Sequence, residues 1–318
     1  MKEKISDANF PIDAEGRVYH VGVARGDLSP LLLTVGDPAR LHRIKQHLDA
    51  GSIRVERTSA RGYTVVTGRY KGVEVSLVAI GMGVAMVDFF VQEVRAVTDG
   101  PLAIIRFGSC GSLLPSLPVG SIGVPEQALQ ITTNYDHWHG GTESKVTSGY
   151  VLSKPIKADE GLQRKLFETL EQAVATPSCA VRSLPLHASA DCFYSTQGRI
   201  DPNFLDNNEN LIDELLEKNP DCASLEMETA HLFHLASIAA PLPPSTSSPS
   251  PAPVPSIRAT ACHMVFAARR TSVKTATQAE TEVGTNEKGD FIEPEEVERL
   301  EREVGRACLE ALFGFRAE

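Results

Sequence analysis

The stretch of sequence that decides the fold is Leu102–Gly111, which reads LAIIRFGSCG. Its first four residues are apolar, and a short apolar run of this kind is typical of a strand buried in a sheet. Arg106, a serine and two glycines follow. Glycines let backbone N–H groups come close to an anion, and a guanidinium matches the geometry of a phosphate or carboxylate. Because ligands of open α/β sheets bind at the carboxyl ends of strands, we predict an anion site where this strand ends. A glycine turn with a solvated arginine is the alternative.

The flanking sequence predicts that strands and helices alternate along the chain. Apolar and β-branched runs predict strands at 31–35, 63–70, 73–80, 102–107, 122–124, 184–188 and 257–266. Helical spacing and capping residues predict helices at 39–48, 162–174, 211–216 and 226–240. They also predict a helix that follows the glycines of residues 81–83 and ends at 97, and a last helix from 294 onward. The pattern predicts one α/β domain over residues 1–318, a mixed twisted sheet flanked by helices.

Residues 241–256 form a low-complexity segment of mainly proline and serine. Such a composition forms neither a core nor a helix. Only one predicted strand and one predicted helix follow it, which is too little for a second domain. We therefore predict a flexible loop insertion within one domain, with a proline-rich motif for binding a partner as the alternative.

Composition narrows the classes of partner and compartment. The chain has 318 residues and a formal net charge of −10, so no broad positive field favours nucleic acid or an anionic membrane. The six cysteines are scattered without a C-x-x-C pair, which suggests neither a zinc site nor a disulfide framework. Reduced thiols are expected in a cytoplasmic protein. The N-terminus lacks the apolar segment of a secretory signal, and no apolar run is long enough to span a bilayer.

Four more stretches carry residues suited to binding an anion or a polar ligand. They are Gly36–Arg40 (GDPAR), Arg61, Phe193–Arg199 (FYSTQGR) and Glu226–Glu228 (EME). Two glutamates two positions apart lie on opposite faces of a helix but on one side of an extended segment. A junction between a strand and a helix at EME would therefore present a glutamate, together with the methionine between the two, to a ligand.

The order and spacing of these motifs, together with Tyr19–Gly22 (YHVG), resemble the nucleoside phosphorylase family, and within it the uridine phosphorylase branch. The resemblance covers most of residues 18–275 apart from the insertion. It implies a nucleoside phosphorylase-like fold and the reversible phosphorolysis of uridine to uracil and ribose 1-phosphate. Phosphate itself attacks the anomeric carbon in that reaction, so phosphate is a co-substrate and no cofactor is expected.

The resemblance also implies a role for each residue that matches a motif. Phosphate would be held by Gly36, Arg40, Arg106 and Ser109, with Arg61 from a neighbouring subunit. Ribose would be held by Glu226, Met227 and Glu228, with His20 from the neighbour. The base would be held by Phe193, Gln197, Arg199 and Arg270. Arg106, Glu228 and Arg199 would be the catalytic residues. Active sites shared in this way imply a homo-oligomer, with a dimer favoured over a hexamer.

Departures from the family pattern bear on metal binding and on the alternatives. Some hexameric bacterial relatives hold a monovalent cation with a glutamate and a serine, where this chain has Gly62 and Met86, so we predict no metal. A purine nucleoside phosphorylase would use an acid on the last strand, and residues 263–270 contain none. A nucleosidase would not need three phosphate arginines. A non-catalytic nucleoside-binding protein is a further alternative, because Met86, Cys110 and the insertion are compatible with relaxed constraint on the sequence. The intact ribose and phosphate residues argue against it.

Overall fold

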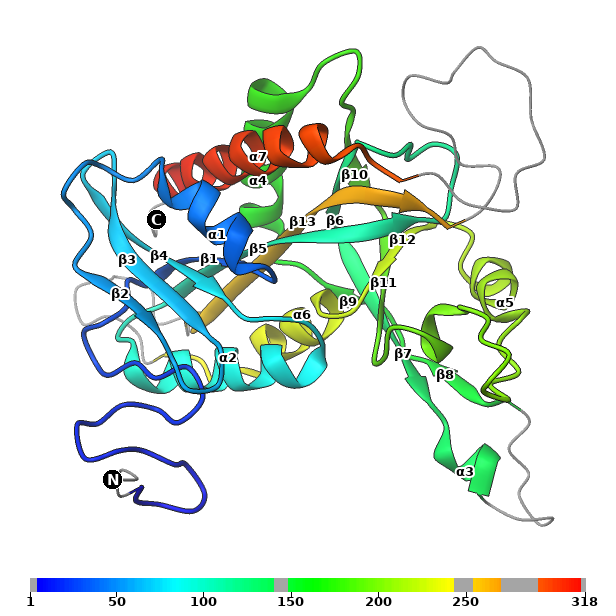
Figure 1. The fold of residues 1–318 in the computed structure, drawn as a ribbon, viewed down its shortest axis with the longest axis horizontal. Helices are drawn as coiled ribbons and strands as arrows, with labels where there is room; N and C mark the ends of the chain where they lie inside the picture. Colours follow the sequence, from blue (N-terminus) through cyan, green and yellow to red (C-terminus); the bar gives the residue numbers. More distant parts are fainter. Residues whose placement is uncertain (1–4, 140–147, 243–253, 270–290, 316–318) are drawn as a thin grey trace.

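A long central strand, β5 (Leu102–Ser112), organises the sheet in the computed structural model, which describes residues 5–139, 148–242, 254–269 and 291–315 (Figure 1). β13 (Ile257–Ala268) runs parallel to β5 and pairs with all of it. β1 (Leu31–Val35) also pairs with β5, and that ladder ends at Phe107. β12 (Cys222–Glu226) pairs with it in the antiparallel sense at Gly111 and Ser112. Residues 108–110 therefore lie between the ends of the two ladders.

The sheet combines parallel and antiparallel pairs. β1 is also parallel to β4 (Val73–Ala79), whereas β3 (Thr64–Tyr70) and β4 form an antiparallel hairpin. The main order is β2 (Val55–Thr58), β3, β4, β1, β5, β12, β11 (Leu186–Ala190), β7 (Gln127–Thr133) and β8 (Tyr150–Leu152). Branches from this path are β6 (Ile122–Pro125), β9 (Ile156–Lys157), β10 (Val181–Leu184) and β13. The predicted mixed sheet is confirmed.

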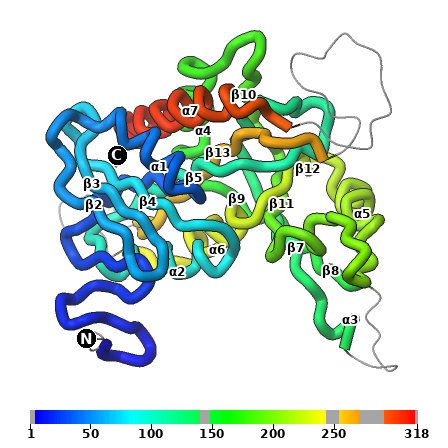
Figure 2. The backbone as a smooth tube through the Cα atoms, in the orientation of Figure 1, coloured from blue at the N-terminus to red at the C-terminus, as the bar shows by residue number. Residues whose placement is uncertain are grey.

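Helices cover both faces of the sheet, and Figure 2 follows the backbone between them. α1 (Pro38–Lys45), α4 (Glu160–Val174) and α7 (Pro294–Gly314) pack on one face, where the larger apolar cluster lies. α2 (Val84–Val97) and α6 (Thr229–Ile238) pack together over a second cluster. Three short helices, α3 (Tyr135–His139), η1 (Ser195–Gln197) and α5 (Leu211–Lys218), complete the described elements. None of the helices in the described ranges combines the length and apolar composition that crossing a membrane requires.

The central strand extends further than the sequence predicts. The strand was expected to end at Phe107, but β5 continues to Ser112, so no glycine turn follows Arg106. Gly108 and Gly111 serve a different purpose. A Cβ on Gly108 would lie 2.6 Å from His263 Nδ1, and one on Gly111 would lie 2.5 Å from Arg269 Cγ. The glycines therefore let side chains of the β13 segment lie against β5.

Other boundaries differ by a few residues. The predicted strand at 184–188 is divided between β10 and β11 by Pro185. α1 ends at Lys45, and α6 begins at Thr229 because Glu226 still belongs to β12. Most of the proline- and serine-rich segment lies outside the described residues, with Leu242 bridged to Val254 at its ends. Its role as a loop insertion stays a prediction.

Close packing between α1 and α7 leads to the first prediction. A Cβ on Gly305 of α7 would lie 2.3 Å from Ile44 Cγ1 of α1. Alanine improves helix propensity by about 1 kcal/mol, but overpacking of a tight core costs about 1–3 kcal/mol. We expect Gly305→Ala to lower the melting temperature measured by circular dichroism. Gly161→Ala is the matched control, because its Cβ would meet atoms at an ordinary 3.5 Å, and a Gly305→Ala protein as stable as that control would contradict this packing.

Candidate active site

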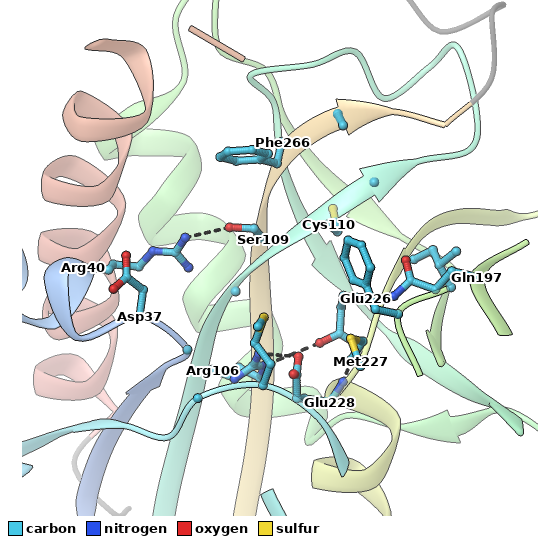
Figure 3. Close-up of a pocket in the computed structure, with 18 of the residues that line it drawn as sticks. Asp37, Arg40, Arg106, Ser109, Cys110, Gln197, Glu226, Met227, Glu228 and Phe266 are labelled. Atoms are coloured by element: carbon cyan, nitrogen blue, oxygen red, sulfur yellow. Dashed lines mark hydrogen bonds and ion pairs between the residues drawn. The ribbon is translucent and has the colours of Figure 1, made fainter. Parts of the chain in front are cut away.

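A cavity of about 590 Å³ opens beside residues 108–110 of β5 (Figure 3). Its walls come from the β1–α1 and β4–α2 connections, β5, the β12–α6 junction, the η1 segment and the end of β13. The lining includes Gly36, Asp37, Arg40, Gly81, Met82, Arg106, Ser109, Cys110, Phe193, Gln197, Arg199, Glu226, Met227, Glu228, Phe266, Arg269 and Phe291. Four of the five sequence motifs therefore converge on one cavity.

Arg40 is fixed at one end of the cavity. Asp37 accepts a hydrogen bond from Ala39 N at the start of α1, so the helix begins with Arg40 in its first turn. The buried guanidinium donates through Nε to Glu301 of α7 at 3.0 Å and through Nη1 to the Phe107 carbonyl at 3.1 Å. Its Nη2 donates to Ser109 Oγ at 2.6 Å. The guanidinium and the hydroxyl thus form a preorganised pair of donors.

Arg106 lies buried between two glutamates. Its Nη2 donates to Glu228 Oε2 at 2.5 Å, and its Nε lies 3.5 Å from Glu226 Oε2. Its Nη1 has no hydrogen-bond partner within the described part of the chain. A buried donor left without a partner costs about 1–3 kcal/mol, and more when the group is charged. An anion in the cavity would satisfy this donor.

The junction between β12 and α6 holds the two glutamates in different environments. Glu226 Oε1 accepts from Ser189 Oγ at 2.6 Å and from the backbone N–H groups of Glu228 and Thr229 at 2.9 and 3.0 Å. Glu228 Oε1 accepts from Gly83 N at 2.5 Å. Burial raises the pKa of Glu228 to about 7. The positive charge of Arg106 opposes this rise, and the nearby Glu226 carboxylate adds to it. Glu226 is therefore tied to the protein, whereas Glu228 shares its two oxygens between a backbone donor and Arg106.

The opposite end of the cavity carries an aromatic ring, an amide and two arginines. The Arg199 guanidinium lies 3.9 Å over the Phe193 ring, and Arg199 Nε has no hydrogen-bond partner among the described residues. Arg269 Nη2 donates to the Gln197 carbonyl at 2.8 Å, and its Nη1 donates to Gln197 Oε1 at 3.4 Å. Burial, followed by the charge of Arg199, lowers the pKa of Arg269 to about 10. This end is rich in donors and suits a ligand with carbonyl oxygens.

The structure adds Arg269 to the cavity lining. Arg270, to which the family resemblance gave a base-binding role, lies outside the described residues, so that role stays a prediction. A register shift in the β13–β5 ladder between Val265 and Ala267 changes which positions of β13 face each side. Alternation counted from the sequence fails past such a bulge. The only signal was that two arginines are adjacent, which does not say which one lines a site.

Two of the assigned residues, His20 and Arg61, do not line the cavity of their own chain. His20 Nδ1 lies 2.6 Å from Glu93 Oε1, and its ring stacks on Phe89 at 3.8 Å. Arg61 contacts the hydroxyl and ring of Tyr19. Both residues therefore belong to a separate part of the surface.

The comparisons with known proteins agree with this geometry. Residues 30–242 match the family model described as the phosphorylase superfamily. The chain belongs to the phosphorylase superfamily. It is 31% identical over 241 residues to a uridine phosphorylase of Thermococcus kodakarensis, an alignment that covers 75% of this chain and 78% of the relative. It is also 31% identical to a DeoD-type purine nucleoside phosphorylase of Myxococcus xanthus, over 57% of this chain and 68% of the relative.

Solved structures of this superfamily show the same fold. A structure from a study of two uridine phosphorylases of the oomycete Phytophthora capsici is 33% identical to this chain, with a TM-score of 0.82. The alignment covers 97% of this chain and 98% of the chain in that structure. A Trypanosoma brucei nucleoside phosphorylase, described as showing uridine phosphorylase activity, has 20% identity and a TM-score of 0.72, covering 96% and 100%. The second likeness concerns the fold alone.

The buried pair between Arg40 and Glu301 leads to the second prediction. Glu301 accepts from Arg40 Nε and from Arg43 Nη1, and it is 2% exposed. Removing one partner of a buried pair leaves an unpaired buried charge, which costs about 3–5 kcal/mol. We expect Glu301→Ala to lower the free energy of unfolding by this amount in urea denaturation without phosphate. Glu298→Ala, which removes an exposed contact with Arg43, should cost less than about 1 kcal/mol, and equal small losses would contradict the role of the buried pair.

Proposed function

We propose that this protein catalyses the reversible phosphorolysis of uridine to uracil and ribose 1-phosphate. The observation that carries the proposal is the order of groups along one cavity. At one end lie Arg40, Ser109 and the Nη1 of Arg106, which has no hydrogen-bond partner among the described residues, and Gln197 and Arg199 line the other end. Glu228, bonded to Arg106, belongs to the same lining. The identity of 31–33% to uridine phosphorylases over most of the chain supports the same reaction.

Phosphate is the nucleophile in this mechanism, so no covalent enzyme intermediate is required. Arg40, Ser109 and Arg106 hold the dianion on the side of the ribose opposite the base. A phosphate oxygen forms a bond to the anomeric carbon while the bond from that carbon to the base nitrogen breaks. The electron pair leaves with uracil. Catalysis then consists of positioning and electrostatic stabilisation.

Glu228 is suited to bind the ribose. Its carboxylate accepts hydrogen bonds from the 2′- and 3′-hydroxyl groups, with Met227 beside the sugar. As positive charge develops on the ribose ring, a carboxylate close to it lowers the energy of the transition state more than that of the ground state. Glu226, whose Oε1 is occupied by protein donors, supports this junction instead of binding sugar directly.

The base end of the cavity favours a pyrimidine with an imide edge. The Gln197 amide both donates and accepts, which matches the adjacent carbonyl and N–H groups of uracil. Arg199 stabilises the negative charge that develops on the uracil oxygen, and Phe193 packs against the ring. A site that pairs with polar base edges discriminates against a base that leaves them unpaired. We therefore propose uridine over inosine as the substrate, with a role in pyrimidine salvage in the cytoplasm.

The positions of His20 and Arg61 outside their own cavity support a shared active site. We propose a homo-oligomer, most simply a two-fold dimer, in which Arg61 completes the phosphate site of the neighbour and His20 contacts the 5′-hydroxyl of its ribose. A closed two-fold arrangement gives two equivalent composite sites. No metal or organic cofactor takes part in the proposed reaction.

The direct test of the function measures uridine and inosine consumption with and without phosphate. We expect phosphate-dependent loss of uridine and much slower loss of inosine. Arg106→Ala should lose about 2–4 kcal/mol of transition-state stabilisation, or about 30- to 1000-fold in kcat/KM. Arg182→Ala, which removes an exposed arginine, is the control and should retain wild-type activity. Uridine loss that does not need phosphate would indicate a hydrolase, and equal turnover of inosine would reject the pyrimidine assignment.

The shared site is tested by mixing two inactive variants. Arg61→Ala and Glu228→Ala should each be nearly inactive. After subunit exchange, half of the dimers are mixed, and each mixed dimer has one site with both lesions and one with neither. About a quarter of all sites should then be active. Exchange shown by differently tagged chains without recovery of activity would mean that Arg61 does not act on a neighbouring site.

A further inference from the structure

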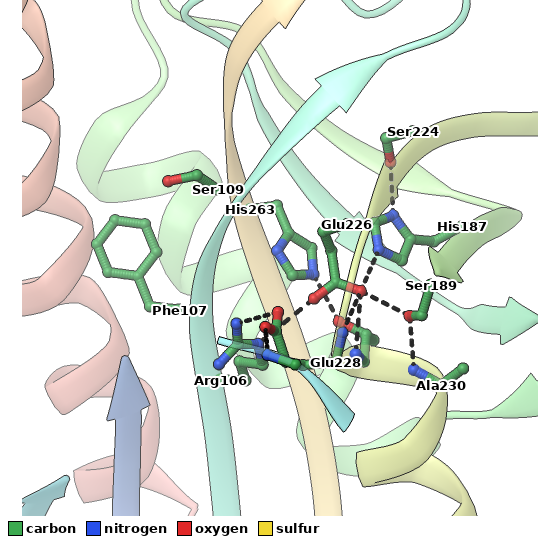
Figure 4. A network of polar contacts seen from close by, with 12 residues as sticks. Arg106, Phe107, Ser109, His187, Ser189, Ser224, Glu226, Glu228, Ala230 and His263 are labelled. Atoms are coloured by element: carbon green, nitrogen blue, oxygen red, sulfur yellow. Dashed lines mark hydrogen bonds and ion pairs between the residues drawn. The ribbon is translucent and has the colours of Figure 1, made fainter. Parts of the chain in front are cut away.

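A network of buried polar groups surrounds the two glutamates (Figure 4), and its two histidines, His187 and His263, are not part of the cavity lining. Its centre is Glu226, whose Oε1 accepts from Ser189 Oγ and from two backbone N–H groups. His187 Nε2 of β11 lies 3.1 Å from the same oxygen. The motifs of the sequence did not single out His187, and nothing in the proposed mechanism uses it.

His187 is held in a defined orientation. It is fully buried, and its Nδ1 lies 2.7 Å from Ser224 Oγ of β12. A Ser224 hydroxyl that donates to Nδ1 leaves the ring proton on Nε2. This nitrogen lies close to Glu226 Oε1, but among the described residues it makes no hydrogen bond of good geometry, so the contact is electrostatic. The ring also stacks on His263 of β13, with 4.6 Å between centroids and 4° between planes.

His263 completes this arrangement from the other strand. Its Nε2 lies 2.9 Å from Thr229 Oγ1, at the first residue of α6. Burial, followed by the neighbouring His187, lowers the pKa of His263 well below its usual value. His263 is therefore neutral, and the stacked pair does not place two positive charges in contact.

The three side chains could also be considered as metal ligands, since one atom from each of His187, Glu226 and His263 lies within 4.8 Å of the others. The stacking argues against this use. The lone pairs of imidazole nitrogens lie in the ring plane, so two parallel rings stacked face to face do not direct them at one ion. Arg106 also places a positive charge 3.5 Å from Glu226. We interpret the cluster as a polar support for Glu226.

The support determines the charge of Glu226. Burial raises the pKa of this carboxyl, but the contact with His187 and the charge of Arg106 outweigh that effect and hold the pKa well below its usual range. The titratable and charged groups around it come from four segments: Arg106 and Cys110 of β5, His187 of β11, His263 of β13 and Glu228 of the junction. The resulting anion attracts the N–H groups at the start of α6, which set the backbone that carries Glu228.

We propose that His187 is a positioning residue for phosphorolysis. Its Nε2, which lies 3.1 Å from Glu226 Oε1, stabilises the ionised carboxylate, and Glu226 in turn holds the start of α6 and the guanidinium of Arg106. His187 thus orients the ribose-binding carboxylate and the phosphate-binding arginine without touching either substrate. This inference rests on the proposed function.

The test compares three variants for uridine phosphorolysis across a pH series. His187→Leu removes the ring proton, and we expect kcat/KM to fall about 10- to 100-fold. Because the carboxyl pair then binds protons more tightly, the acid limb of the pH profile should move to higher pH. His187→Gln keeps an N–H near the position of Nε2. It should therefore recover most of the lost kcat/KM and return the acid limb towards its wild-type position. His234→Leu, which replaces an exposed histidine of α6, is the matched control and should behave as wild type.

The outcomes separate this inference from the function itself. A wild-type enzyme and a control variant that both fail to consume uridine would reject the proposed function, and the role of His187 with it. An active wild type, with His187→Leu retaining its rate and acid limb, would overturn the role of His187 alone. A loss that glutamine does not reduce would indicate a packing role and also overturn it.

A second variant covers the case in which His187→Leu does not fold. Ser224→Ala leaves the imidazole in place but removes the hydroxyl beside Nδ1. We expect a smaller loss of about 3- to 10-fold, with the acid limb displaced in the same direction. A folded Ser224→Ala protein with the wild-type profile would contradict the proposal.

Discussion

The site depends on one buried interaction, in which the Arg106 guanidinium lies between the carboxylates of Glu226 and Glu228. A guanidinium in a protein interior needs partners, because its desolvation is otherwise too costly. Two carboxylates around one cation leave an excess of negative charge. The structure accommodates this excess unequally, since the pKa of Glu226 is held low and that of Glu228 is raised. Of these two carboxylates, Glu228 is thus the one whose charge responds more readily to a ligand.

The pairing of the strands leaves Arg106 and the two glutamates accessible to a ligand in the cavity. β1 and β12 pair with successive parts of the same edge of β5, and their ladders do not meet. Ser109 and Cys110 lie at this opening, while β13 continues along the other edge. Because β5 is supported along its whole length by β13, the opening does not leave the strand unpaired. The same topology brings the first turn of α1 and the start of α6 to one cavity, where their donors and acceptors oppose each other across the ligand space.

Most of the elements and most of the cavity residues could be predicted from the sequence. Apolar runs and capping residues are local signals, and they located β1, α1 and α7 within a few residues. The family resemblance assigned residues such as Arg106 and Gln197, which the structure brings to one cavity. The end of β5 and the position of Arg269 were missed. Both depend on how β13 lies against β5, and the bulge near Phe266 leaves no pattern in a single sequence.

The sequence by itself determined the alternation of strands and helices, the family and the residue types available for an anion and a sugar. These follow from periodicity and from short motifs, which act over a few residues. Only the tertiary structure decided which groups are paired. Glu301 is more than 250 positions from Arg40 in the chain, and His187 meets Glu226 only because β11 and β12 are neighbours in the sheet. Charge, burial and hydrogen bonding depend on distance in space, so the protonation of the two glutamates and the support behind them could not be deduced from the order of residues.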